Sequence, residues 1–408
     1  MRYSRVRRNS YEWVKWVYCG WFFTMLLFIG VYIFGKTNIA LLGMTAMGIM
    51  TVIYVMLFKG KVDEAKDYSS LINKHIDENK LFEKEKVNDR EVYKYYPEAY
   101  WKVDKEKNML YIRFRLSGNK INLRGLEQDL GDRLVKNVLN VYEEHGYIEY
   151  LFELNEEEPL IIDSTNKVGG KYGETQIKLS QSLIWDYRKT PHFFLSGATG
   201  VGKSTFARYL ISALVNRGVR VVYIDIKRDC DMELYCHYNQ NVTYVYEPEA
   251  IAKEIRELAE ELQNRAMDIE ASGINEDFEF GFNPVFLICD EIVLLKLLLP
   301  KKLYDEIITN INAIIVGGRS KSIFCGLITQ TALAEYIGNS GIRGNLGLKV
   351  ALGSLSSTEM GMVFGNEFSE VKSLRYGQVG AGMIMRNGID SRPRDYVAPY
   401  IKSTFTRT

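Results

Sequence analysis

Two long runs of apolar residues stand out near the start of the chain. Residues 17–34 and 39–58 contain no charged side chain, and each is about as long as a helix that crosses a hydrocarbon core, ~20 residues. Only residues 35–38 separate them, so we expect a tight transmembrane helical hairpin. The alternative is a hairpin buried in a soluble domain. Two such runs do not fit a single cleaved signal peptide.

Basic residues flank this hairpin asymmetrically. Four arginines precede it and Lys59, Lys61 and Lys66 follow it, whereas only Lys36 lies in the connection. Cytoplasmic flanks carry the excess of Lys and Arg, so both ends of the chain are predicted to face the cytoplasm. We therefore expect a multi-pass protein of the cell membrane.

Shorter patterns predict a small domain after the hairpin. Residues 59–93 carry many charges of both signs, which is typical of a solvated helical stalk. Beyond them, hydropathy predicts three strands and one amphipathic helix, in the order strand 100–103, strand 109–116, helix 122–140 and strand 147–154. We expect a small α/β domain over residues 94–176, without a recognisable catalytic constellation.

From residue 177 onward, apolar runs alternate with amphipathic segments, as in an α/β fold with a parallel sheet. The predicted strands are 192–196, 219–226, 284–288 and 323–329, with two edge strands at 347–352 and 381–385. The predicted helices are 205–216, 249–271 and 292–316. Strands that are apolar throughout are expected to be buried on both faces. We assign residues 177–408 to one α/β domain.

The composition narrows the choice of function only slightly. The 408-residue chain has a formal net charge of +1, which excludes a uniformly basic nucleic-acid binder but not a local basic channel. Its five cysteines are scattered, without the paired spacing of a zinc site or a disulfide framework. The candidate chemistry therefore rests on motifs.

The segment after the first of these α/β strands fits G-x-x-x-x-G-K-[ST], the P-loop that binds nucleoside triphosphate phosphates. The residues predicted to bind the nucleotide are Gly197, Ala198, Thr199, Gly200, Val201, Gly202, Lys203, Ser204 and the following Thr205. The glycines let backbone N–H groups turn toward an anion, and the next helix points its positive end there. Lys203 is predicted to reach the β- and γ-phosphates of ATP, and Ser204 to ligate Mg²⁺. A strand before and a helix after the segment disfavour a chance match.

Acidic residues end two further strands. Asp290 and Glu291 follow residues 284–288. Asp290 is predicted to hold Mg²⁺, directly or through water, and Glu291 to polarise the attacking water. Asp225 lies at the end of another strand, and with Lys227 it either orders the nucleotide site or caps that strand.

Several separated segments of residues 177–400 resemble the FtsK/SpoIIIE family of DNA translocases, within the hexameric RecA-like motor ATPases. The matching segments are Pro191-His192 with the P-loop, Asp225-Ile226-Lys227, residues 264–274, Asp290-Glu291, residues 319–323, Thr329-Gln330, residues 342–351 and residues 378–384. Lys349 stands where the family has Arg. Residues 110–155 more faintly resemble the small domain that precedes the family's motor.

The resemblance implies a RecA-like P-loop ATPase motor that forms a homo-hexamer, with ATP and Mg²⁺ at each subunit interface. It implies that Gln330 senses the γ-phosphate and couples hydrolysis to movement. A cation from the neighbouring subunit is expected to offset negative charge that develops during phosphoryl transfer. The candidates are Arg319, Arg343 and Lys349, each of which is equally explained as a surface charge.

The layout is similar to that of the coupling proteins of Gram-positive conjugative elements, because one hairpin precedes one motor and no winged-helix module follows it. This resemblance implies DNA as cargo, with relaxase and mating-channel proteins as partners. Lys296, Lys301 and Lys302 are candidates for DNA contact, or else a charged helix face. A chromosome-segregation or division translocase and an ATPase for specialised protein secretion are the alternatives. The sequence leaves single- and double-stranded DNA open, although the motor lacks a pattern of stacking aromatic residues, which weakly disfavours a dedicated single-strand reader.

Overall fold

The computed structural model divides into two compact units, residues 1–154 and 155–408. The described residues are 3–6, 29, 60–116, 121–156, 158–164, 168–171, 173–273, 281–330, 340–371 and 377–403. Apart from residue 29, the predicted transmembrane hairpin lies outside them. None of the described helices combines the length and the apolar character needed to cross a bilayer. The units divide after residue 154, whereas the sequence patterns placed a domain boundary after residue 176.

In its described residues beyond 59, unit 1 combines an antiparallel sheet with the helices α3 (Gly60–Glu78) and α4 (Glu127–Leu134). Its sheet has the order β1-β4-β5-β7-β6, and β2 and β3 pair separately. The strands are β1 (Ser4–Arg5), β2 (Glu83–Val87), β3 (Arg90–Tyr95), β4 (Ala99–Asp104), β5 (Met109–Arg115), β6 (Val138–Glu144) and β7 (Tyr147–Glu153). Alternate residues of β5, such as Ile112, point into the core. The helix predicted over 122–140 is shorter than expected, because Val135 is left-handed and ends it.

Residues 60–95 differ from the solvated stalk that their charges predicted. Helix α3 carries Ile72, His75 and Ile76, whose relative exposure is 0%. The rest of the segment folds into the β2–β3 hairpin. Ile72 and Ile76 are four residues apart and so lie on one helix face, but charged neighbours conceal this short apolar stripe in the sequence. The helix is therefore part of unit 1.

Unit 2 contains an eight-stranded sheet in the order β13-β12-β14-β15-β11-β16-β17-β18. The strands are β11 (Phe193–Gly197), β12 (Arg220–Asp225), β13 (Val242–Val245), β14 (Val285–Asp290), β15 (Ile323–Thr329), β16 (Leu348–Leu352), β17 (Ala381–Arg386) and β18 (Arg394–Val397). Pairing is parallel from β13 to β16, and β17 and β18 are antiparallel. The prediction that β16 and β17 are edge strands was wrong, because both pair on two sides within this sheet. Complete burial of β16 fits its internal position.

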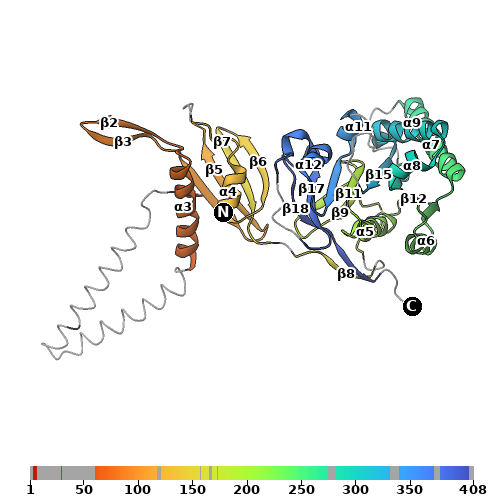
Figure 1. Cartoon of the computed structure of the whole chain (residues 1–408), viewed down its shortest axis with the longest axis horizontal. Coiled ribbons are helices and arrows are strands. Elements are labelled where there is room, and N and C mark those ends of the chain that lie inside the picture. The colour runs from red at the N-terminus through yellow and green to blue at the C-terminus, as the bar shows by residue number, and fades with distance from the viewer. Residues whose placement is uncertain are drawn as a thin grey trace. The chain divides into compact units, whose positions relative to one another are not determined.

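Helices cover both faces of this sheet (Figure 1). They are α5 (Lys203–Val215), α6 (Cys230–His237), α7 (Pro248–Ser272), α8 (Ile292–Leu298), α9 (Lys301–Gly317), α11 (Ser340–Asn345) and α12 (Ser357–Phe364), with the 3₁₀ turns η3 (Arg319–Lys321) and η4 (Asn366–Phe368). Apolar residues of α5 and α6 belong to one core cluster, and those of α7, α8, α9 and α12 belong to the other. The helical region predicted over 292–316 consists of two helices, α8 and α9, which are divided at Pro300 because its ring cannot continue a helix from the preceding turn.

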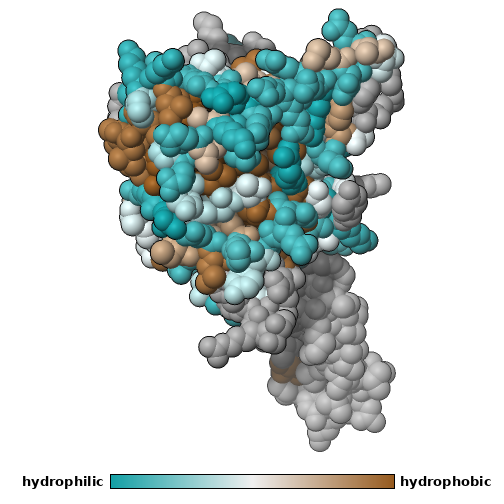
Figure 2. Space-filling view, turned by 90° about the vertical axis from the view of Figure 1, so that its right-hand side faces the viewer, coloured by the Kyte–Doolittle hydropathy of each residue, from teal (hydrophilic) through white to brown (hydrophobic). Residues whose placement is uncertain are grey.

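Two short strand pairs complete unit 2. They are β9 (Gln176–Lys178) with β10 (Ile184–Asp186), and β8 (Ile161–Ser164) with β19 (Tyr400–Ser403). Figure 2 shows that the face of unit 2 turned to the viewer is mainly hydrophilic, with smaller apolar areas between the polar side chains. Among the exposed apolar side chains of unit 2 are Leu297 and Leu298 on α8, which are 66% and 59% exposed.

Candidate active site

The carboxyl ends of four neighbouring parallel strands bring the motif residues together. In the order β12-β14-β15-β11, these strands end at Asp225, Asp290, Thr329 and Gly197. The pairs Asp225–Asp290 and Ser196–Thr329 are in register across the sheet. Ligands of open α/β sheets bind at this carboxyl edge. The fold therefore assembles one candidate site from segments far apart in the sequence.

The P-loop follows β11 and closes against the end of β16. Gly197 has φ +153°, and a Cβ built there would lie 2.4 Å from the carbonyl oxygen of Leu352. Gly202 has φ +102° and stands at the N-terminus of α5. Ser204, in the first turn of that helix, is exposed. A loop that only glycine can complete, beside an open helix N-terminus, fits the phosphates of a nucleotide.

Lys203 lies inside the curve of this loop. Its Nζ donates hydrogen bonds to the carbonyl oxygens of Gly197 at 2.6 Å and Ala198 at 2.8 Å. Burial lowers the pKa of the Lys203 ammonium, while the charges of Glu291 and Asp290 oppose this shift. Its ammonium therefore lies among the P-loop carbonyls and within the field of the acidic pair.

A buried tyrosine orients Asp290. The hydroxyl of Tyr223 donates to Oδ2 of Asp290 at 2.6 Å. Burial raises the pKa of Asp290, and the neighbouring charges of Asp225 and Glu291 add to that rise. A divalent cation would offset this repulsion. The Asp290 carboxylate and the Ser204 hydroxyl are oxygen ligands of the kind that Mg²⁺ prefers, so the residues present fit that metal.

Glu291 is held by donors on both of its carboxylate oxygens. Oε1 accepts from the backbone N–H of Gln330 at 3.1 Å and lies 3.5 Å from the hydroxyl of Thr329, while Oε2 accepts from Nζ of Lys227 at 3.1 Å. The residue is 5% exposed and has a left-handed backbone, with φ +54°. Gln330 also accepts from the hydroxyl of Thr199 at 3.2 Å. Gln330 thus links the P-loop to Glu291.

Asp225 orders its own loop. This carboxylate is 1% exposed and accepts from the backbone N–H groups of Lys227 at 3.0 Å and Asp229 at 2.8 Å, and from the hydroxyl of Tyr244 at 3.0 Å. Both of its oxygens are engaged in these contacts. The geometry favours the alternative in which Asp225 caps the end of β12 and shapes the loop that carries Lys227.

The three cations expected to act across a subunit interface do not join the site of their own chain. Arg319 lies in η3, just before β15, and Arg343 lies in α11, before β16. Residues that precede parallel strands lie at the sheet edge opposite the P-loop. Lys349 lies within β16 and is 8% exposed. Its pKa is lowered mainly by burial, and the charge of Arg343 lowers it further.

Sequence reasoning missed two contributions to the site. One is Tyr223, whose signal is a phenol inside the apolar strand β12, two residues before Asp225. The other is the turn before β17, in which the backbone N–H of Gly380 donates to the carbonyl of Val201 at 2.9 Å. The turn therefore braces the P-loop from the C-terminal part of the chain.

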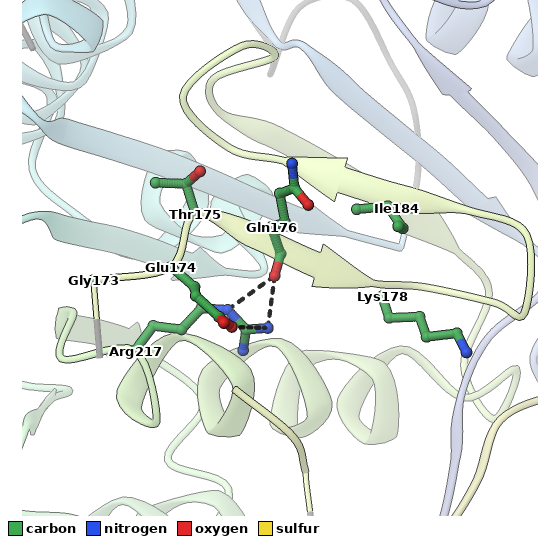
Figure 3. Close-up of a pocket in the computed structure, with 7 residues that line it drawn as sticks. All are labelled: Gly173, Glu174, Thr175, Gln176, Lys178, Ile184 and Arg217. Atoms are coloured by element: carbon green, nitrogen blue, oxygen red, sulfur yellow. Dashed lines mark hydrogen bonds and ion pairs between the residues drawn. The ribbon is translucent and has the colours of Figure 1, made fainter. Parts of the chain in front are cut away.

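A pocket of about 410 Å³ lies elsewhere in unit 2 (Figure 3). It is lined by Gly173, Glu174, Thr175, Gln176, Lys178, Ile184 and Arg217. Arg217 follows the C-terminus of α5, the end of this helix opposite the P-loop. Its guanidinium donates to the carbonyl of Gln176 through Nε at 2.9 Å and Nη2 at 2.6 Å, as the dashed lines in Figure 3 show. The pocket is thus separate from the motif residues.

Comparisons with known proteins agree with the motifs. Residues 174–283 match the FtsK/SpoIIIE family. The FtsK domain-containing protein YdcQ of Bacillus subtilis (strain 168) is 27% identical over 378 residues, which cover 86% of this chain and 75% of that protein. A DNA translocase FtsK of Corynebacterium efficiens is 25% identical over 203 residues, or 43% of this chain. This chain spans 21% of that translocase's length.

Two solved structures are similar in fold. The pCW3 conjugation coupling protein TcpA, in a monomer form with ATPγS, has a TM-score of 0.52 at 17% identity, and the match covers 75% of this chain and 89% of that one. ATPases 2 and 3 of EssC from Geobacillus thermodenitrificans have a TM-score of 0.50 at 13% identity, covering 62% of this chain and 49% of that one. The resemblance predicted from the motifs is confirmed: the chain has an α/β P-loop ATPase-like fold, and residues 174–283 match the FtsK/SpoIIIE family.

Proposed function

We propose that this chain is a motor that hydrolyses ATP to move DNA. The observation that carries the proposal is the convergence of the P-loop, Asp290-Glu291 and Gln330 on one sheet edge, within a domain of the FtsK/SpoIIIE type. Relatives described as DNA translocases support DNA as the cargo.

In this proposal each residue of the site has a separate task. The backbone of residues 197–205 and the Lys203 ammonium would hold the phosphates, and Ser204 and Asp290 would hold Mg²⁺. The metal supplies positive charge that offsets the charge developing on the transferred phosphoryl group. Glu291 accepts a proton from the attacking water. Gln330, which touches both the P-loop and Glu291, transmits the loss of the γ-phosphate to the rest of the chain.

We propose that the working form is a ring, a homo-hexamer with each nucleotide at a subunit interface. The positions of Arg319 and Arg343 support this, because they lie away from the site of their own chain and can act at a neighbour's site. Lys349 is the weakest of the three candidates, because it is 8% exposed within β16. A cation donated in this way stabilises the transition state of phosphoryl transfer. Of the three, Arg319 is exposed and Arg343 is half-buried.

We further propose that residues 17–34 and 39–58 anchor the motor in the cell membrane, with both ends in the cytoplasm. The absence of charge from both runs and the basic residues that flank them support this placement. Similarity in fold to a conjugation coupling protein favours conjugative DNA transfer as the process, with relaxase and mating-channel proteins as partners.

The test is the steady-state ATPase activity of the purified full-length chain in detergent, with and without single- and double-stranded DNA. We expect stimulation by DNA that falls as salt rises, since contacts to phosphates release counterions. Lys203→Ala and Glu291→Gln should each abolish the activity, the first by weakening ATP binding and the second by removing the base. The DNA form that stimulates more strongly identifies the cargo.

Other outcomes separate the competing functions. Activity that is indifferent to every DNA, but is stimulated by a secreted polypeptide, would replace the proposal with protein export. A deletion strain that transfers plasmids normally but segregates chromosomes poorly would favour a division translocase. Loss of plasmid transfer with normal division supports the coupling protein.

A further inference from the structure

The donor to Oε2 of Glu291 is the ammonium of Lys227, at 3.1 Å. Neither the P-loop nor the acidic motif includes this lysine. We propose that Lys227 restrains the general base: the resting chain holds Glu291 in this ion pair, and hydrolysis accelerates when a stimulating ligand breaks it. The inference rests on the proposed role of Glu291, and Lys227 is a positioning residue that acts through it.

Hydrogen bonds to Asp225 fix the backbone of the loop that carries Lys227. Two backbone N–H groups of the loop, those of residues 227 and 229, donate to the buried carboxylate of Asp225, and Arg228 between them is left-handed, with φ +57°. Tyr244, from the adjacent strand β13, donates to the same carboxylate. The loop backbone is therefore fixed, and only the flexible Lys227 side chain has to move when the pair breaks.

The pairing occupies the carboxylate with which Glu291 would hold the attacking water. Its carboxylate must accept a proton from water, but Oε1 already accepts from the backbone of Gln330 and Oε2 is neutralised by an ammonium. A water molecule that hydrogen-bonds to Oε2 therefore has to compete with the Lys227 ammonium, which lies 3.1 Å away. Hydrolysis is therefore slower in chains that keep the ion pair than in chains that have broken it.

The Lys227–Glu291 ion pair is strong enough to hold Glu291 in the resting chain and weak enough for a bound ligand to break it. The Glu291 side chain is 7% exposed, but that of Lys227 is 41% exposed, so water screens the attraction. Lys203 lies close enough for the two ammonium groups to repel, and the charge of Lys227 lowers the pKa of Lys203. A ligand that favours the unpaired state can shift the population, because only a modest difference in affinity is required.

The experiment compares Lys227→Met with wild type in full-length protein at saturating ATP, with and without the stimulating DNA. We expect the basal rate to rise about five-fold, the upper range for a partly exposed ion pair, while the stimulated rate stays the same. The ratio of stimulated to basal rate should fall by the same factor. An unchanged or lower basal rate in Lys227→Met would overturn the proposal.

Matched variants test whether the effect is specific. Lys227→Arg keeps the cation and should keep the low basal rate. Arg228→Met removes a cation from the same loop that instead contacts Glu233 and the ring of Tyr246, and should leave the basal rate unchanged. A rise in Arg228→Met equal to that in Lys227→Met would contradict the proposal, because it would show that loop charge rather than the ion pair matters.

Two further measurements separate this inference from its alternatives. The dissociation constant for ATPγS should be unchanged in Lys227→Met, whereas a lysine that mainly contacts nucleotide would weaken binding and overturn the restraint. In the Glu291→Gln background, Lys227→Met should cause no rise, and a rise would show that the effect bypasses Glu291. If no DNA stimulates wild type, the proposed DNA motor fails, but the basal rates still decide the restraint.

Discussion

At the scale of single residues, Tyr223 fixes the candidate metal ligand Asp290. Burial and the charge of Asp290 raise the pKa of Tyr223 well above its usual range, so its hydroxyl stays a donor. We predict that Tyr223→Phe raises the Mg²⁺ concentration for half-maximal ATPase activity about ten-fold, because partners behind a metal ligand hold it in place. Mg²⁺ titrations measure this. Tyr187→Phe is the control, since Tyr187 is equally buried but donates to the carbonyl of Glu174. Equal shifts in both variants would contradict the prediction.

The residues that a short local pattern specifies were predictable from the sequence, as Lys203 and Asp290 show. The contact between Lys227 and Glu291 was not, because the two residues are 64 positions apart and meet only where β12 pairs with β14. The same holds for Gln330 and Thr199, which are 131 positions apart. Local motifs therefore identify the candidate site residues, whereas the contacts between them depend on the order of the strands in the sheet.

At the scale of elements, fully buried strands were the easiest to predict. The strand predicted over 323–329 matches β15, because both of its faces are covered and its residues are apolar throughout. Strand order was not predictable, and β16 and β17 lie inside the sheet although both were predicted to be edge strands. A helix was predicted where α3 lies, but its buried face was not, since its two buried isoleucines are outnumbered by charged residues.

The placement of β15 beside β11 requires a glycine at position 326. A Cβ built on Gly326 would lie 2.1 Å from the ring of Phe193. The Phe193 ring cannot easily move away, because the ring centroids of Trp185 and Phe286 lie 6.0 and 6.3 Å from its own. We predict that Gly326→Ala destabilises the protein by about 1–3 kcal/mol through overpacking. Urea unfolding midpoints measure this. Gly344→Ala is the control, because a Cβ there meets nothing within 4 Å. Equal midpoints for Gly326→Ala and wild type would refute the prediction.

At the scale of the whole molecule, the proposed anchor and the candidate site are separate parts of the chain. Every described residue of the site belongs to unit 2, whereas residues 17–34 and 39–58 belong to the first 154 residues. Deleting all of residues 1–58 would also remove β1, which pairs with β4 in unit 1. A cleaner variant keeps residues 1–10 and replaces residues 11–58 with a flexible Gly/Ser linker.

We predict that this linker variant binds ATPγS as tightly as the full chain, because unit 2 is unaltered, but leaves the membrane fraction and fails in cells. Cell fractionation and plasmid transfer from a deletion strain measure the two losses. A variant in which an unrelated transmembrane helical hairpin replaces residues 11–58 should regain both, which excludes damage to unit 1 as the cause. Full transfer by the linker variant would show that anchoring is dispensable. Loss of ATPγS binding would instead show that the N-terminal segment supports the nucleotide site, so that the two parts are not independent.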